Sequence, residues 1–232
     1  MKGVYRVKDL TKKYDKKEIF KGLNLEIKND EITVILGKSG CGKTTLMKIL
    51  SGLDKDITGE IRFYNEKNIE TSIKYGFVFQ ESRLLPWLNV KENICIHGKK
   101  IDVDSYLDMV GLRDYKNSYP EELSGGMAQR VSLIRALSYQ PDTLFMDEPF
   151  SALDYFTRRQ LQSELLKIYE KTKIGIIFVT HNLEEAIALA HRVLVIKDGN
   201  ILEFKIEKEF PRKLEDIELI KLKSEIINLI EN

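Results

Sequence analysis

A short glycine-rich run near the N-terminus restricts this chain more than any other feature. It begins at Gly37, ends in Gly42-Lys43-Thr44, follows an apolar β-branched stretch at 32–36 and precedes apolar residues at helical spacing. In the order strand, loop, helix, such a run turns backbone N–H groups inward around a polyphosphate, and the helix N-terminus adds partial positive charge. We therefore predict a phosphate-binding loop in which Lys43 reaches the terminal phosphates and Thr44 ligates Mg²⁺.

Short apolar runs alternate with helical patterns further along the chain. The runs at 143–146 and 176–179 are typical of buried parallel strands, and the spacing at 158–169 and 183–191 is typical of crossover helices. These patterns predict the α/β class. The length of 232 residues predicts one large domain, 1–232.

Two segments depart from this alternation. Strand signals fade from 82 to 140, which predicts an inserted helical subdomain with its clearest helices at 104–110 and 127–137. A hairpin pattern at 193–204 precedes a helical tail at 207–232. The tail helix is expected to bury its apolar residues, Leu214, Ile217, Ile220 and Ile227.

Two carboxylates follow the apolar run at 143–146. Ligand sites of open α/β sheets lie beyond the carboxyl ends of their strands, so Asp147 is placed to hold Mg²⁺ through its water shell. Glu148 has no metal to bind and could polarise an attacking water as a general base. The alternative is an ordinary acidic loop after a strand, and the presence of Lys43 favours the catalytic interpretation.

A second candidate anion-binding end is the run Ser124-Gly125-Gly126 at the start of a helix that extends to Leu137. A hydroxyl, bare backbone N–H groups and the helix dipole coincide there. Taken alone, the run is more typical of an ordinary helix N-cap with flexible glycines, and the other motifs favour the anion-binding interpretation. One chain would therefore carry two phosphate-binding ends.

Charge and cysteine content limit the partners and the compartment. Lys and Arg number 37 against 36 Asp and Glu, so we expect no nucleic acid partner. Two isolated cysteines, Cys41 and Cys95, fit a reducing cytosol. We expect no signal peptide, and the apolar segments are too short to span a membrane. Work at a membrane would need another chain as the anchor.

Together these motifs resemble those of the ATP-binding cassette (ABC) ATPases, from Tyr14 to about Phe204. The resemblance implies a P-loop NTPase with a RecA-like mixed sheet, an N-terminal antiparallel β subdomain and an inserted α-helical subdomain. It implies ATP and Mg²⁺ as cofactors. The matching positions are Tyr14 as the aromatic that stacks on adenine, the Walker A loop (Gly37, Lys38, Ser39, Gly40, Cys41, Gly42, Lys43, Thr44, Thr45), Gln80 at Mg²⁺ and the lytic water, the signature (Ser124, Gly125, Gly126, Gln129), the Walker B pair Asp147 and Glu148, the loop 151–154, and His181.

The resemblance also implies a mechanism. Two copies close head to tail, and each ATP lies between Walker A of one copy and the signature of the other. Ser124 and Gly126 then bind the γ-phosphate in trans, while His181 positions that phosphate or the water that Glu148 activates.

The segment from Gln80 to Ile94 is similar to that of the nitrate, sulfonate and taurine importer group. It implies contact with a transmembrane permease and, indirectly, a substrate-binding protein, which would place the chain on the cytoplasmic face of the cell membrane. Leu84, Leu85 and Trp87 are expected to form an exposed apolar knob there, or else to pack the helical subdomain. Asn182 departs from the family, which most often has an acid after the histidine.

Other classes remain open at this stage: an ABC ATPase of an exporter or of another cargo, a soluble ABC protein, and a P-loop kinase, which would lack the signature and His181. Tyr14 could pack rather than stack, and Lys12 beside it is expected on a solvated face. His97 and His191 match no motif and are expected at the surface.

Overall fold

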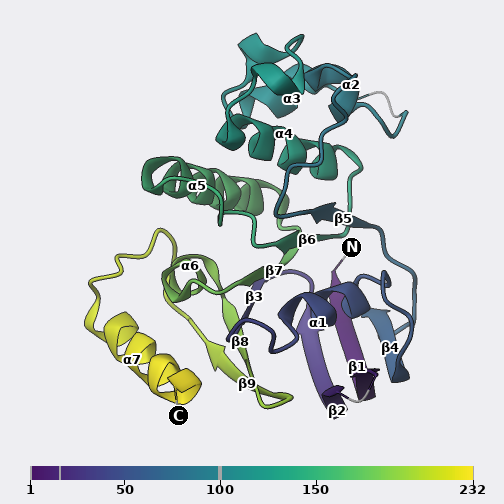
Figure 1. Cartoon of the computed structure of the whole chain (residues 1–232), viewed down its shortest axis with the longest axis vertical. Coiled ribbons are helices and arrows are strands. Elements are labelled where there is room, and N and C mark those ends of the chain that lie inside the picture. Colours follow the sequence, from purple (N-terminus) through teal and green to yellow (C-terminus); the bar gives the residue numbers. More distant parts are fainter. Residues whose placement is uncertain (1, 16, 99–100, 232) are drawn as a thin grey trace.

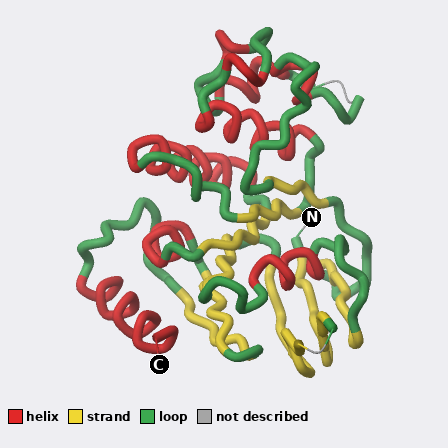
Figure 2. The backbone as a smooth tube through the Cα atoms, in the orientation of Figure 1, coloured by secondary structure: helices red, strands yellow, loops and turns green. Residues whose placement is uncertain are grey.

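The computed structural model describes residues 2–15, 17–98 and 101–231, which form two β-sheets with helices packed around them (Figures 1 and 2). The larger sheet has the strand order β5-β6-β7-β3-β8-β9, and all of its strands are parallel except β9, which pairs antiparallel with β8. Its strands are β3 (Ile32–Leu36), β5 (Tyr75–Val78), β6 (Thr143–Asp147), β7 (Gly175–Thr180), β8 (Arg192–Lys197) and β9 (Asn200–Lys205).

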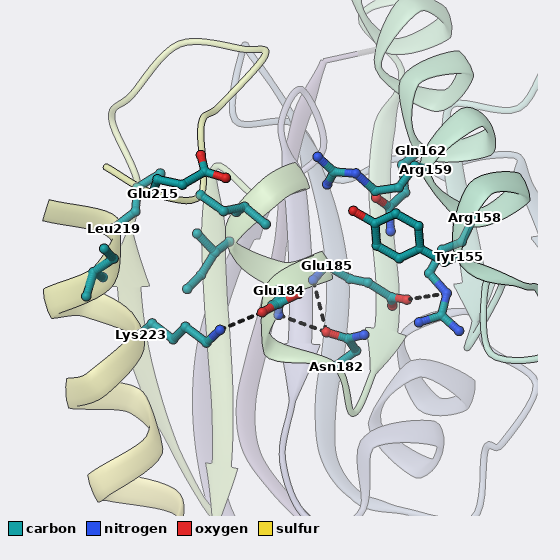
Figure 3. Close-up of a pocket in the computed structure, with 13 residues that line it drawn as sticks. Tyr155, Arg158, Arg159, Gln162, Asn182, Glu184, Glu185, Glu215, Leu219 and Lys223 are labelled. Atoms are coloured by element: carbon teal, nitrogen blue, oxygen red, sulfur yellow. Dashed lines mark hydrogen bonds and ion pairs between the residues drawn. The ribbon is translucent and has the colours of Figure 1, made fainter. Parts of the chain in front are cut away.

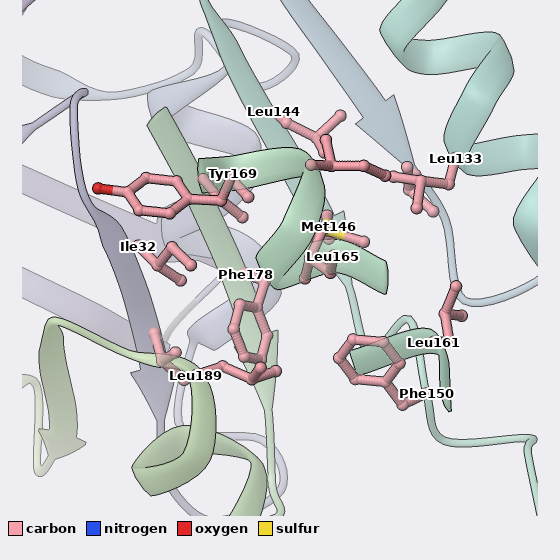
Figure 4. Close-up of a cluster of buried hydrophobic side chains, with 14 of the residues drawn as sticks. Ile32, Leu133, Leu144, Met146, Phe150, Leu161, Leu165, Tyr169, Phe178 and Leu189 are labelled. Carbon is pink, nitrogen blue, oxygen red and sulfur yellow. The ribbon is translucent and has the colours of Figure 1, made fainter. Parts of the chain in front are cut away.

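The central strands β6, β7, β3 and β8 are buried on both faces. Side chains alternate between the two faces along each strand. In β3, for example, Val34 belongs to one apolar cluster and Ile35 to the other. The first cluster includes residues of the inserted helices and of α5 (Tyr155–Thr172) and α6 (Leu183–Leu189), as Figure 4 shows. The second cluster joins the sheet to α1 (Lys43–Leu50) and to the smaller sheet.

The smaller sheet is the antiparallel subdomain that the resemblance implies. Its strand order is β2-β1-β4, with β1 at Gly3–Tyr14, β2 at Lys17–Lys28 and β4 at Thr58–Asn65. Sequence patterning misses β4, because Phe63 is the only fully buried side chain of that strand.

Helices fill the described part of the segment between β5 and β6. They are α2 (Val90–Ile94), α3 (Val103–Asp108), two short 3-10 helices at Arg113–Tyr115 and Pro120–Glu122, and α4 (Gly125–Ser138). The helix expected at 104–110 therefore begins and ends slightly earlier. Asn89 starts α2 with a capping box, in which its side chain accepts from the Glu92 amide and the Glu92 side chain accepts from the Asn89 amide.

The C-terminal part corrects two expectations. The helix expected to reach His191 ends at Leu189, because Ala190 is extended and the His191 amide donates to the Ile32 carbonyl instead. In the tail helix α7 (Ile217–Glu231), Ile217 is 71% exposed, so it does not belong to the buried face as predicted.

The buried residues of α7 are Leu219 and Ile226, and Ile220 is also largely exposed. The tail expected at 207–232 is described as far as residue 231. Within the described residues, none of the helices combines the length and the apolar character that crossing a bilayer requires.

Candidate active site

The glycine loop lies at the carboxyl end of β3 and leads into α1. Gly40 and Gly42 have φ angles of 77° and 108°, which glycine adopts without steric cost. The ammonium of Lys43, at the first turn of α1, donates to the Gly37 carbonyl at 2.9 Å. The loop therefore curls around a lysine at a helix N-terminus, the arrangement expected of a phosphate cradle.

Asp147 ends β6 beside this loop. Its Oδ1 accepts a hydrogen bond from Thr44 Oγ1 at 3.1 Å. Burial raises the pKa of the Asp147 carboxyl, and the charge of Glu148 raises it further, against the lowering effect of the Thr44 bond. A half-buried carboxylate beside a hydroxyl suits a hard divalent cation such as Mg²⁺, which takes oxygen ligands.

The described residues contain no group of three or more His, Cys, Asp or Glu side chains that could hold a metal ion. Thr44 and Asp147 would therefore have to share a cation with phosphate oxygens, which is the usual arrangement for Mg²⁺ in nucleotide sites.

Glu148 and His181 meet at the ends of adjacent strands. The distance between Glu148 Oε2 and His181 Nδ1 is 3.1 Å. Glu148 has a φ angle of 44°, rare for a non-glycine residue, and is held there because its amide donates to the Val179 carbonyl and its carbonyl accepts from Ser151 Oγ. Such strained residues concentrate at functional sites, where the surrounding bonds keep them in place.

Glu148 and much of the glycine loop border a hollow of about 430 Å³, whereas Asp147 and His181 are not among its lining residues. It is lined by Tyr14, Lys17, Ile19, Ser39, Gly40, Gly42, Lys43, Thr44, Thr45 and Glu148. The structure thus brings together the predicted aromatic, most of the predicted phosphate loop and the predicted base. The signature residues Ser124–Gln129 do not line it.

The signature run begins α4, which Figure 1 places far from α1 along the longest axis of the molecule. Ser124 Oγ accepts a hydrogen bond from the Met127 amide, so Ser124 does act as an ordinary helix N-cap. Ser124 and Gly125 are nevertheless exposed, and a Cβ on Gly125 would meet nothing within 4 Å. Ser124 and Gly125 of the predicted second anion-binding end are therefore open to approach from outside the chain, whereas Gly126 is buried.

Comparison with known proteins agrees with this geometry. The family model for ABC transporters matches residues 20–151. The aliphatic sulfonates import ATP-binding protein SsuB of Bacillus cereus is 44% identical over 202 residues, which cover 84% of this chain and 80% of that protein. This chain belongs to the ABC transporter ATP-binding family. An uncharacterised ABC transporter ATP-binding protein of Methanocaldococcus jannaschii is 37% identical, with all of this chain and 93% of that protein covered.

Solved structures of cassettes share the fold. CbiO1 of Clostridium perfringens, part of the CbiONQ transporter complex, superposes with a TM-score of 0.79 at 26% identity over the whole of both chains. A dimeric cassette in a post-hydrolysis state with ADP and phosphate has a TM-score of 0.73 at 32% identity, covering 88% of this chain and all of that one. The predicted fold class and the predicted ATPase activity are confirmed. The roles of individual residues stay predictions.

The loop of His181 is held by a buried network that sequence reasoning missed. Thr180 Oγ1 donates to Glu185 Oε2 at 2.6 Å, and Arg158 lies 3.7 Å from the other oxygen of Glu185. Burial raises the pKa of the Glu185 carboxyl, and its bond from Thr180 opposes that rise. Asn182, the departure from the family, caps α6 by accepting from two backbone amides. The only sequence signal for this network is the acidic first turn of α6.

Two predicted glutamines lie outside the hollow. Gln80 is exposed just beyond β5. Gln129 is buried in α4, and its amide donates to the Phe79 carbonyl at 3.1 Å. Gln129 therefore links the signature helix to the loop that carries Gln80 and is not open to solvent.

The expected apolar knob is narrower than predicted. Leu84 and Leu85 are half-buried, and Leu84 packs against the first apolar cluster. Trp87 is 70% exposed. Both alternatives are thus partly correct, because the leucine packs the subdomain while the tryptophan faces outward.

A second hollow of about 490 Å³ lies between α5, α6 and the tail (Figure 3). Lys223 pairs with Glu184 across it at 2.6 Å. The lining of this second hollow includes none of the glycine loop, which lines the hollow beside α1 instead.

Proposed function

We propose that two copies of this cassette close around ATP and that hydrolysis drives a separate permease importing a small organic anion of the sulfonate class. The observation that carries the first part is the position of the two anion-binding ends. The glycine loop borders the hollow, whereas Ser124 and Gly125 are exposed at the start of a distant helix. A second copy can supply the missing end, so that Ser124, Gly125 and Gly126 of one chain face the γ-phosphate held by the other.

The phosphate loop would bind the phosphates, and Thr44 together with residues at the strand ends would bind Mg²⁺. Lys43 and the backbone amides of 37–45 hold the β- and γ-phosphates through charge and N–H donors. Thr44 and Asp147 would hold Mg²⁺, with Gln80 closing on it from the β5 loop. The cation, when bound, supplies neutralisation of phosphate charge.

The chemical step uses Glu148 as the general base. Its carboxylate takes a proton from water, the water oxygen attacks the γ-phosphorus, and the bond from that phosphorus to the β–γ bridging oxygen breaks to give ADP and phosphate. His181 lies 3.1 Å from the carboxylate and orients it toward the γ-phosphate. Gln129 acts through Gln80, because its amide holds the adjacent Phe79 carbonyl.

The permease contact is assigned to the segment from Gln80 to Ile94. Trp87 is exposed there, and exposed aromatics are favoured anchors of protein interfaces. The cassette would then lie on the cytoplasmic face of the membrane through its permease. The cargo class rests on relatives about 40% identical that are named aliphatic sulfonates import proteins.

The decisive experiment is Glu148→Gln. The variant should retain ATP binding, lose hydrolysis by at least about a hundredfold, and elute as a dimer with ATP and as a monomer without it, as measured by light scattering after gel filtration. Glu170→Gln, an exposed position on α5, is the matched control. Hydrolysis at the wild-type rate would remove Glu148 from its role.

Adding Ser124→Tyr to Glu148→Gln tests the shared site. The bulky side chain at the exposed end should abolish the ATP-dependent dimer while leaving the affinity of the monomer for ATP within about twofold. A dimer that persists in the double variant would contradict the head-to-tail arrangement. Transport of a sulfonate by the cassette reconstituted with its permease and binding protein tests the cargo.

A further inference from the structure

A buried lysine, Lys12, lies beside Tyr14, the tyrosine predicted to stack on the adenine base. Lys12 of β1 is 2% exposed, although sequence reasoning expected it on a solvated face. Its ammonium donates to Asp54 Oδ1 at 3.0 Å, to the Asp56 carbonyl at 2.7 Å and to Asp56 Oδ2 at 3.2 Å. An ammonium has three donors, so these acceptors satisfy it fully.

Tyr14 contacts both Lys12 and Asp54. Its hydroxyl donates to Asp54 Oδ2 at 3.1 Å, and the Lys12 ammonium lies 4.7 Å from the centroid of its ring. Tyr14 is 47% exposed and lines the hollow, whereas Lys12 does not. The cation therefore contacts the ring from the protein side and leaves the solvent side of the ring open.

Asp54 follows α1 and is bonded to its last turn. The amides of Leu53 and Asp54 both donate to the Lys48 carbonyl, which ties Asp54 to the last turn of the helix. The first residues of that helix are Lys43 and Thr44, at the phosphate end of the hollow. One helix thus fixes the phosphate loop at its start and, through Asp54, the tyrosine ring at its end.

We propose that Lys12 and Asp54 are positioning residues for the nucleotide base: they hold the Tyr14 ring as a preformed platform at a set distance from the phosphate loop. The inference rests on the proposed role of Tyr14 as the base contact. It assigns a function to two residues that touch neither phosphate nor the reacting atoms.

The physical reason is preorganisation. A half-exposed tyrosine without these contacts would lose side-chain rotational freedom each time a base stacked on it, and that entropy would be subtracted from binding. Here the ring is ordered beforehand by one hydrogen bond to a charged carboxylate and one cation–π contact.

The carboxylate remains charged for this work. Burial alone would raise the pKa of Asp54, but the hydrogen bonds from Lys12, the Asp56 amide and Tyr14 lower that pKa to below its ordinary value. Burial disfavours the charged form of Lys12, but its bonds to Asp54 and Asp56 raise its pKa above the ordinary value, so Lys12 and Asp54 are both ionised at neutral pH.

The competing explanation is that the ion pair only fastens β1 to the segment after α1. The two explanations predict different effects on ligands with and without a nucleobase. Inorganic tripolyphosphate can bind the glycine loop, but it has no base to stack on Tyr14. The experiment compares dissociation constants for ATP and for tripolyphosphate by calorimetry, in the full chain.

Lys12→Met should weaken ATP binding about five- to tenfold, the size expected from losing a cation–π contact and a charge-assisted hydrogen bond. Tripolyphosphate binding should change less than about twofold. KM for ATP should rise while kcat at saturating ATP stays the same. Lys12→Arg should restore most of the ATP affinity. The matched control is Lys13→Met, next in the strand, whose lysine pairs with Glu18 at the surface.

Tyr14→Phe removes the phenol–carboxylate bond without leaving a buried charge unpaired, so it tests the proposal even if Lys12→Met does not fold. It should weaken ATP binding severalfold and leave tripolyphosphate binding unchanged. Two results would overturn the positioning role alone. One is an equal loss of affinity for ATP and for tripolyphosphate. The other is an unchanged affinity for ATP in both Lys12→Met and Tyr14→Phe while Tyr14→Ala weakens ATP binding. ATP affinity untouched by Tyr14→Ala would overturn the base contact itself and the inference with it.

Discussion

His191 couples the stability of the fold to pH, contrary to its expected place at the surface. The residue follows α6 in the chain, and the centroid of its ring is 5.0 Å from that of Tyr169 and 4.9 Å from that of Phe210. Its Nδ1 accepts from the Ile32 amide at 3.1 Å. Burial, together with the nearby positive charges of Arg212 and Lys173, lowers its pKa from 6.5 to about 4, against the opposing effect of Asp30.

The direction of the effect follows from that lowered pKa. The unfolded chain binds a proton on His191 near pH 6.5, and the folded chain resists doing so until about pH 4. The stabilisation from the neutral ring is therefore complete above pH 6.5 and is lost as the pH falls toward 4. For an ideal titration the loss between pH 7 and pH 5 is about 2 kcal/mol, and solvent at the half-buried ring reduces it to roughly 1 to 2 kcal/mol.

His191→Asn tests this reasoning, because the amide oxygen can accept from Ile32 but does not titrate. The free energy of unfolding is measured by urea denaturation from pH 7 to pH 5. The variant should be less stable at pH 7, since it loses the ring contacts, and the gap to wild type should narrow by roughly 1 to 2 kcal/mol at pH 5. His97→Asn, at an exposed histidine, should leave the pH dependence unchanged. Parallel curves for wild type and His191→Asn would refute the argument.

Three further outcomes are expected. Alkylation of Cys41, half-buried in the glycine loop, should block ATP binding and be slowed by ATP, as followed by mass spectrometry; inactivation that persists in Cys41→Ala would contradict this. Leu165→Ala should lower the free energy of unfolding by about 2–5 kcal/mol without changing the affinity for ATP, because Leu165 is fully buried on the opposite face of the sheet from α1. Lys167→Ala, at an exposed position of α5, is its control. Trp87→Ala should keep the ATPase of the isolated cassette but weaken permease binding about tenfold or more in a pull-down titration, unlike Tyr119→Ala at another exposed aromatic of the insertion.

The sequence predicts the site well where function depends on local order. Three of the predicted motifs stand at the carboxyl ends of strands of the parallel sheet, so the loop after β3, the carboxylates at the end of β6 and His181 after β7 all reach one edge. Strand identity and chain order suffice to place them there, without any knowledge of distances.

Expectations fail where the deciding partner is remote in sequence. In the sequence Lys12 resembles a surface lysine, because its partner Asp54 lies 42 residues later in the chain. His191 resembles a surface histidine until the amide of Ile32, 159 residues earlier, donates to its ring. Charge and polarity fix neither case, because a polar residue is buried only when tertiary structure supplies its partners.

The different roles of Asp147 and Glu148 follow from strand geometry. Phe145 and Asp147 lie on the same face of β6, because side chains two residues apart point the same way, and Phe145 belongs to the cluster that α1 covers. Asp147 is thereby directed at Thr44 of α1. Glu148 is one residue further, past the end of the strand, where its left-handed backbone turns it toward His181. A slip of one residue in the pairing of β6 with β7 would exchange the two faces and place the other carboxylate against α1. The register of β6 therefore also fixes which carboxylate contacts Thr44 and which contacts His181.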